Sequence, residues 1–320
     1  MKTIFAACAA VGTMIAGAAA QVQVDSALPT YTTAQGVSGS IKSIGSDTLN
    51  NLMTYWAEDF KKAYPNVKIE IEGKGSSTAP PALIEGQAQF GPMSRPMKGA
   101  EIDSFEKKYG YKPVELRTAV DALAVYVHKD CPLNELSMDQ VRKIFSVDGP
   151  DMTWGDVGVK DPAWATKPIS LYGRNSASGT YGFFKEHALN KKDYKPSVKE
   201  QPGSSAVVQA VATDKFGMGY SGLGYKTADV KAVKIAAKDG ETAYEANAQN
   251  SYDGVYPLAR FLYVYVNHKP GSTMDPLRAE FIKKIFSRQG QESVVKDGYF
   301  PITADIARED LKKVGLPVRF

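Results

Sequence analysis

The chain has 320 residues, of which 43% are hydrophobic, and this is enough for a sizeable core and roughly two domains. Its 39 basic and 35 acidic residues leave a formal net charge of +4, and both signs are mixed along the chain. This balance excludes proteins that bind nucleic acid or anionic membrane surfaces mainly through a large net charge.

The first 20 residues have the features of a signal peptide. Lys2 supplies the positive start, residues 4–20 are apolar and small, and an A-x-A cleavage site precedes Gln21. A membrane anchor is the alternative, but the apolar run is short and rich in alanine. We therefore expect an exported protein, periplasmic or secreted, in which residues 21–40 form a loose polar arm.

Catalytic and metal-binding patterns are weak in this sequence. The exported chain would keep one cysteine, Cys131, which is followed by a proline and cannot form an intramolecular disulfide. The three histidines, at 128, 187 and 268, do not have the spacing of metal ligands. We expect a protein without metal or cofactor that is not an enzyme.

Predicted strands and helices alternate after the arm, which predicts an α/β fold. The predicted strands are 41–44, 67–71, 88–93, 114–120, 120–128, 169–172, 217–220 and 257–266. The predicted helices start at 49, 79, 101, 138, 178, 206, 276 and 304, and Asp47 or Thr48 would cap the first of them.

Three of the strand-to-helix turns are rich in hydroxyl groups: 46–48, 76–78 and 178–180. Helix N-termini carry free N–H groups and a positive dipole end, and they gather at the carboxyl ends of parallel strands. The pattern therefore predicts that the three turns converge on one anion. The alternative is that each serine or threonine is an ordinary helix cap.

Two charged residues strengthen the prediction of an anion site. Arg174 precedes the third turn and can present a fixed guanidinium fork to a tetrahedral oxyanion. Asp121 lies inside an apolar strand, where a carboxylate needs partners, so it either bonds to backbone amides or faces a ligand. The strands at 122–128 and 257–266 are alike in character, as expected of a two-strand hinge.

Taken together and in this order, five segments resemble one family: 45–49, 75–78, 91–95, 121–123 and 173–180. From about Ser43 to Pro301 the sequence resembles the phosphate-binding protein of the phosphate-specific ABC transporter, in the type II periplasmic binding protein superfamily. The resemblance implies two α/β lobes, each a mixed sheet flanked by helices, joined by two hinge strands. One lobe would hold residues 41–122 and 262–320, and the other residues 123–261.

The resemblance also implies a set of phosphate ligands from both lobes. These are the Thr48 hydroxyl, the Leu49 amide, Ser76 or Ser77, Ser94, Arg174, Ser178, Gly179 and Thr180. The sequence departs from the family at one place, because well-known members carry an acidic ligand after the serine that matches Ser94, and here that residue is Arg95. Arg95 would be a second cation at the ligand or would bridge the lobes to another acid.

Asp121 is the candidate to supply the missing carboxylate. At neutral pH phosphate still carries a proton and sulfate does not, and a carboxylate accepts a hydrogen bond from the first but repels the second. We therefore predict that Asp121 selects phosphate over sulfate. The alternative is a structural acid bonded to backbone amides.

The expected function is a monomeric receptor that captures inorganic phosphate and delivers it to an ABC permease. One alternative is a receptor for another oxyanion, such as sulfate, molybdate or tungstate. A phosphatase or adhesion protein on the same scaffold is a second alternative, and a purely structural surface protein is a third.

Overall fold

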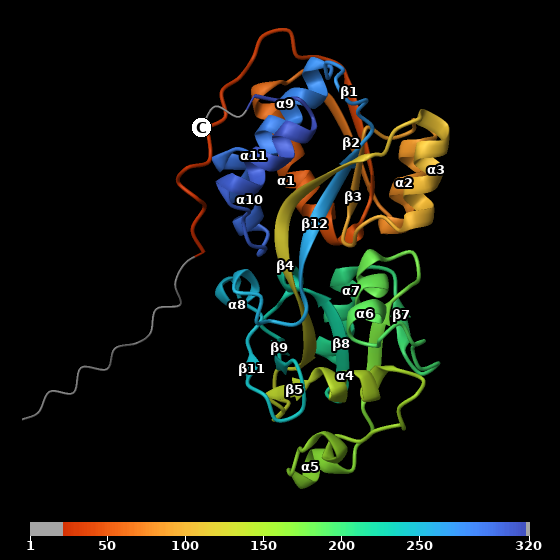
Figure 1. Ribbon diagram of the computed structural model, residues 1–320. Helices are drawn as coiled ribbons and strands as arrows, with labels where there is room; N and C mark the ends of the chain where they lie inside the picture. Colours follow the sequence, from red (N-terminus) through yellow and green to blue (C-terminus); the bar gives the residue numbers. More distant parts are fainter. Residues whose placement is uncertain (1–21, 318–320) are drawn as a thin grey trace, which may run out of the picture.

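The structure, a computed structural model, describes residues 22–317, so the predicted signal peptide at 1–20 lies outside the described residues. Two α/β lobes lie one above the other and are joined by long strands (Figure 1). The α/β fold predicted from the alternation of elements is confirmed.

The first lobe contains both ends of the described chain. Its strands are β1 (Ser40–Gly45), β2 (Lys68–Gly73), β3 (Phe90–Met93) and β12 (Ala259–Val266), with the 3-10 helices η1 (Asp47–Leu49) and η2 (Ser76–Thr78). Its helices are α1 (Asn50–Ala63), α2 (Ala79–Ile84), α3 (Gly99–Tyr109), α9 (Pro276–Ile285), α10 (Arg288–Lys296) and α11 (Ala304–Lys313).

The second lobe is built from the middle of the chain. Its strands are β5 (Glu135–Ser137), β6 (Ser170–Arg174), β7 (Lys199–Gln201), β8 (Gly217–Gly222), β9 (Val230–Ala232), β10 (Lys234–Ala236) and β11 (Ala243–Tyr244). Its helices are α4 (Met138–Phe145), α5 (Pro162–Ala165), α6 (Gly179–His187), α7 (Ser204–Thr213) and α8 (Ala248–Tyr252), with η3 (Gly155–Val157) and η4 (Leu223–Tyr225).

Strand β4 (Val114–His128) runs through both lobes. It pairs antiparallel with β12 over Val114–Ala122 and then with β8 over Leu123–Val127, in the strand order β2-β1-β3-β12-β4-β8-β6-β7. The sequence predicts strand residues at 114–120 and at 120–128, and the structure joins them into one strand that includes Asp121.

Each lobe has a hydrophobic core of its own. Trp56, Phe60 and Phe281 are completely buried in the first lobe, among the sheet and helices α1, α9 and α10. Trp154 and Phe184 are completely buried in the second lobe. Separate cores of this kind are the feature expected of two structural units joined by connecting strands.

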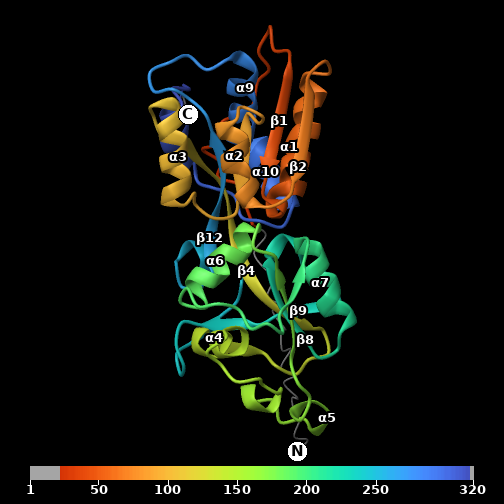
Figure 2. The same ribbon diagram turned by 90° about the vertical axis from the view of Figure 1, so that its right-hand side faces the viewer.

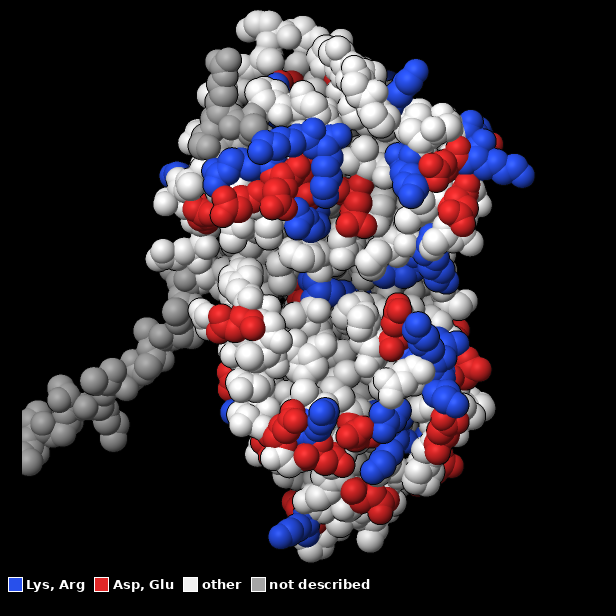
Figure 3. Space-filling model, viewed as in Figure 1, with Lys and Arg blue, Asp and Glu red and all other residues white. Residues whose placement is uncertain are grey.

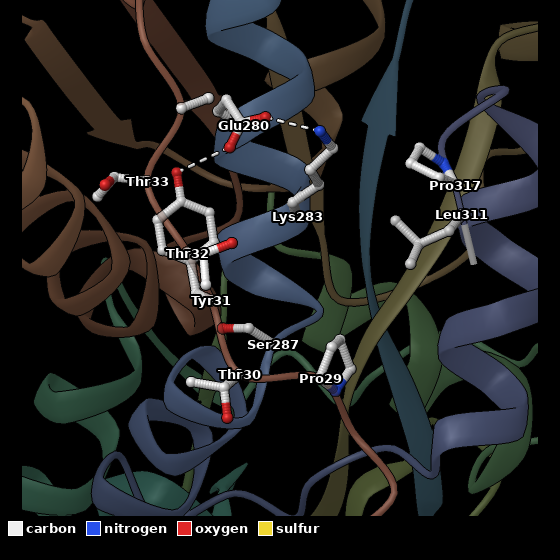
Figure 4. Close-up of a pocket in the computed structure, with 11 residues that line it drawn as sticks. Pro29, Thr30, Tyr31, Thr32, Thr33, Glu280, Lys283, Ser287, Leu311 and Pro317 are labelled. Carbon is white, nitrogen blue, oxygen red and sulfur yellow. Dashed lines mark hydrogen bonds and ion pairs between the residues drawn. The ribbon is translucent and has the colours of Figure 1, made fainter. Parts of the chain in front are cut away.

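Residues 22–39 form no helix or strand and are mostly exposed, but the first lobe anchors this arm at several points. Leu28 is buried in the first core, and the Tyr31 hydroxyl lies 2.7 Å from that of Tyr64 and donates to Glu280 (Figure 4).

The sequence analysis did not predict helix α10, because the sequence of this helix is polar and contains a glycine.

The surface agrees with the mixed charges of the sequence. On the face shown in Figure 3, basic and acidic side chains are interspersed over both lobes. Over residues 22–317, no helix is both long and apolar enough to cross a membrane.

Candidate functional site

The three hydroxyl-rich turns meet between the two lobes. The hydroxyl oxygens of Thr48 in η1 and Thr180 in α6 are 3.0 Å apart, although the residues come from different lobes. Ser76 of η2 lies beside Gly179, where an added Cβ would be 2.2 Å from the serine Oγ. Only glycine permits this close approach. The contacts of Thr48 with Thr180 and of Ser76 with Gly179 therefore bring the three turns together, as the sequence predicts.

Buried hydroxyl groups form a cluster on the first-lobe side of this site. Ser94 Oγ lies 3.2 Å from Ser76 Oγ and 3.1 Å from Ser46 Oγ, and the Ser94 amide donates to Ser76 Oγ. All three serines are almost fully buried. Hydroxyl groups both donate and accept, so the cluster can turn its protons toward an anion.

Arg174, at the end of β6, places a buried guanidinium group at the site. Its Nη1 donates to Ser204 Oγ at 2.7 Å, and its Nη2 lies 3.3 Å from the Asp47 carboxylate. Its Nε is buried and has no hydrogen-bond partner among residues 22–317. The pKa of Arg174 is lowered, because the effect of burial is larger than the opposing effect of the Asp47 charge.

The N-terminus of α6 completes the second-lobe side. The Ser178 side chain caps this helix by accepting from the amides of Thr180 and Tyr181. The cap interpretation of Ser178 is confirmed, whereas its role as an anion ligand stays a prediction. The positive end of the helix dipole lies where the other turns converge.

A second buried arginine was missed in the sequence. Arg260 of β12 stands opposite Asp121 of β4, and its Nε and Nη2 donate to the Asp121 carboxylate at 3.0 and 2.8 Å. Its Nη1 donates to the Ser94 carbonyl and its Nη2 to the Thr180 hydroxyl, so it contacts both lobes. The signal available in the sequence was a charged residue inside an apolar strand, which is also the feature that drew attention to Asp121.

Asp121 is fully buried and its other carboxylate oxygen accepts from the Leu223 amide at 3.0 Å. This contact is the one expected of a structural acid, yet the carboxylate also lies next to the site, because Arg260 Nη2 reaches both Asp121 and Thr180. Both interpretations of Asp121 from the sequence remain open, and its role in selecting phosphate over sulfate stays a prediction.

Asp47 does not cap the first helix, and neither does Thr48, so that prediction was wrong. No side chain caps η1 or α1. The Asp47 carboxylate instead reaches the second lobe, where it accepts from the Ser204 amide at 2.7 Å and pairs with Arg174. An aspartate that caps a helix and an aspartate that pairs with a residue of the other lobe look alike in sequence, since both roles need only a short acidic side chain at a turn.

The remaining predicted ligands lie at the margin of the site. The Arg95 guanidinium pairs with Glu101 of its own lobe at 2.7 Å, and not with an acid across the lobes as one interpretation had it. Ser77 and Arg95 line a groove of about 480 Å³ at the lobe boundary, together with Ser178. The Leu49 side chain is buried in the first core, so only its backbone can face a ligand.

The described residues also bear on two other kinds of site, a metal site and a reactive thiol. Residues 22–317 contain no group of three or more His, Cys, Asp or Glu side chains that could hold a metal ion. Cys131 is buried, and burial raises the pKa of its thiol, which opposes a role as a nucleophile. The site offers hydroxyl groups, helix amides and a guanidinium, which suit a small oxyanion.

Comparisons with known proteins agree with this description. Residues 30–289 match the family described as PBP superfamily domain. The phosphate-binding protein PstS of Pseudomonas aeruginosa is 54% identical over 322 residues, covering 99% of both chains. PstS of Staphylococcus haemolyticus is 33% identical, covering 86% of this chain and 84% of its own.

Solved structures show the same fold. One from Clostridium perfringens, described as a candidate phosphate ABC transporter substrate-binding protein with bound phosphate, superimposes with a TM-score of 0.70 at 25% identity. It covers 82% of this chain and all of its own. An ABC-type phosphate transport receptor from Vibrio cholerae superimposes with a TM-score of 0.65 at 21% identity over 82% of this chain and all of its own.

Proposed function

The chain belongs to the PBP superfamily and to the family of PstS phosphate-binding proteins, and we propose that it captures inorganic phosphate between its lobes and delivers it to an ABC permease. It is a receptor and not an enzyme. The resemblance seen in the sequence names the same family, and the site described above has the chemistry that phosphate requires.

The unpartnered Nε of Arg174 is the observation that carries the proposal. A buried guanidinium N–H without a partner is costly, and a phosphate oxygen would satisfy it with a charge-assisted hydrogen bond. The hydroxyl groups of Thr48, Ser76, Ser94 and Thr180 are buried as well, and Thr48 directly follows Asp47, which pairs with Arg174. In an enclosed space each hydrogen bond to the anion is stronger than it is in water.

The proposed ligand groups come from both lobes, so binding requires closure. Residues 41–122 and 262–320 form one lobe in this proposal, residues 123–261 form the other, and β4 and β12 act as the hinge. The phosphate ligands are the side chains or amides of Thr48, Leu49, Ser76, Ser94, Asp121, Arg174, Ser178, Gly179 and Thr180, with Ser77 and Arg95 at the entrance. Closure of two lobes about hinge strands hides the ion from water.

The same proposal covers location and partners. The protein acts as a monomer in the periplasm, or is secreted, after its first 20 residues are removed, and its only macromolecular partner in transport is the permease. The features of the signal peptide in the sequence support this location.

Phosphate content of the purified protein is the direct test. We expect about one phosphate per chain to be released on denaturation. The refolded, phosphate-free protein should then bind phosphate more tightly than it binds sulfate or molybdate in titrations. Absence of phosphate together with tight binding of sulfate or molybdate would favour the other oxyanion receptors. Release of alcohol from an aryl phosphate would favour the phosphatase.

A further inference from the structure

The inference concerns Asp47, and it rests on the proposed function. Three groups of the second lobe contact this first-lobe residue. The Ser204 amide donates to its carboxylate at 2.7 Å, Arg174 Nη2 lies 3.3 Å from the same oxygen, and the Tyr225 hydroxyl donates to its backbone carbonyl at 2.9 Å. Asp47 is therefore a point of contact between the lobes as well as a neighbour of the site.

The carboxylate of Asp47 caps a helix of the other lobe. Gly203 is the N-cap of α7 and offers no side chain, so the first amide of the helix, that of Ser204, bonds instead to Asp47. An added Cβ on Gly203 would stand 3.2 Å from the Asp47 carboxylate, so glycine keeps room for it. Helix α7 lies at the top of the second lobe, beside the first lobe (Figure 2).

The same carboxylate holds Arg174 in place. Residues 175–183, which follow Arg174, contain no acid, and the guanidinium is fixed by Ser204 on one side and by Asp47 on the other. Both contacts use Nη atoms and leave Nε for the anion. If the lobes separate, the Asp47 contact is lost and the guanidinium can turn.

We propose that Asp47 is a positioning residue that couples closure of the lobes to the orientation of Arg174. In the open state Arg174 keeps only the contact with Ser204 of its own lobe. Closure brings the Asp47 carboxylate onto Ser204 and Arg174 together, so the anion meets a correctly turned guanidinium only in the closed state. Phosphate and the Asp47 contact then stabilise the same arrangement of lobes.

The sign of one measurement distinguishes this role from simple electrostatics. A carboxylate near an anion site repels the anion, so removal of its charge should tighten binding if Asp47 does nothing else. If Asp47 positions Arg174 and favours closure, removal of its charge weakens binding instead. Asp47→Asn keeps an acceptor for the Ser204 amide and loses the charge opposite Arg174.

The experiment is calorimetric titration of inorganic phosphate into phosphate-free wild type and variants, with thermal unfolding to verify that each variant is folded. We expect Asp47→Asn to raise Kd about tenfold or more, Asp47→Ala to raise it further, and Asp47→Glu to restore part of the affinity. Small-angle X-ray scattering without phosphate should show Asp47→Asn to be at least as open as wild type.

Two further variants serve as controls. Asp229→Asn makes the same change in net charge at the far end of β4, where Asp229 pairs with Lys129, and should leave Kd unchanged. Tyr225→Phe removes a contact between the lobes but leaves the carboxylate beside Arg174, and should weaken binding less than Asp47→Asn.

Equal or tighter phosphate binding by Asp47→Asn overturns the inference and leaves the proposed function intact. Equal losses in Asp47→Asn and Tyr225→Phe overturn it as well, because Asp47 would then be one closure contact among several. If wild type binds no phosphate, the proposed function fails and the inference fails with it. If Asp47→Asn does not fold, Asp47→Ser takes its place under the same criteria.

Discussion

Two arginine–aspartate pairs lie at the centre of the molecule, and they differ in what they join. Arg260 and Asp121 stand opposite one another on the hinge strands β12 and β4, where the sheet holds them together. Arg174 and Asp47 come from different lobes and meet only where the lobes touch. The first pair belongs to the permanent framework, and the second depends on the distance between the lobes.

The two pairs also differ in how far their aspartate side chains are exposed. The side chains of Arg260 and Asp121 are 2% and 0% exposed, whereas that of Asp47 remains 24% exposed even in this closed arrangement. Loss of one partner from a fully buried pair leaves a charge without water or counter-ion, which mainly costs stability. Loss of one partner from a pair at a movable interface mainly costs binding.

The largest effect on stability is expected from Arg260→Met. It leaves Asp121 buried with a single amide partner and should lower the free energy of unfolding by about 3–5 kcal/mol. Urea unfolding measures this loss, and adding Asp121→Asn in the same chain should recover part of it. A loss below about 1 kcal/mol would show that the hinge pair is not a structural element.

Arg174→Ala should weaken phosphate binding strongly and change stability little. It removes the charged donors from the site, so the Kd for phosphate should rise by about 100-fold or more, while the partly exposed Asp47 is hydrated and stability changes little. Calorimetric titration and urea unfolding on the same samples provide the two numbers. Arg142→Gln, which removes a surface arginine paired with Asp139, is the matched control. A Kd within threefold of wild type contradicts the proposed site.

A third acid near the hinge pair predicts a dependence on pH. Burial, with a smaller contribution from the Asp121 charge, raises the pKa of Asp297 to about 7, and one of its oxygens lacks a hydrogen-bond partner among residues 22–317. The tyrosines at 225 and 299 face the same region. The folded state therefore binds this proton more tightly than the unfolded state does, and stability is lost as pH rises through about 7.

Asp297→Asn removes this titration. The variant should be more stable than wild type at pH 8, on the order of 2 kcal/mol, and the difference should shrink as pH falls toward 4. Thermal unfolding of both proteins over this range measures it. A difference that does not change with pH would refute the assignment.

The smallest expected effect tests selectivity at the hinge pair. Asp121→Asn replaces a carboxylate that repels a fully ionised oxyanion, so the ratio of sulfate Kd to phosphate Kd should fall by about tenfold. Competitive titration with the two anions measures this ratio. If both proteins reject sulfate to the same degree, Asp121 is a structural partner of Arg260 and not the discriminator.

Local patterns in the sequence were sufficient for much of the fold and part of the site. The Ser178 cap follows from a short-range rule for residues that precede a helix. The helix after Thr48 follows from the spacing of its apolar residues, since Thr48 itself does not cap it. The convergence of the three hydroxyl-rich turns followed from a general property of parallel sheets. Family resemblance supplied the identity of the expected ligand.

Only the tertiary structure decided which charged groups pair. Asp47 looked like a cap for its own helix, and Arg260 was not singled out in its apolar strand. Arg95 was expected either at the ligand or as a bridge between the lobes, but it bonds to Glu101 of its own lobe.

In sequence an acid or a base shows its charge but not its partner. Asp121 and Arg260 are 139 residues apart and are brought together by sheet register. Asp47 and Ser204 are 157 residues apart and meet through the contact between lobes. Arg95, in contrast, pairs within its own lobe with Glu101, six residues away. A cap such as Ser178 is local and follows from its position before a helix, whereas the counter-ion of an acid such as Asp47 depends on the whole fold.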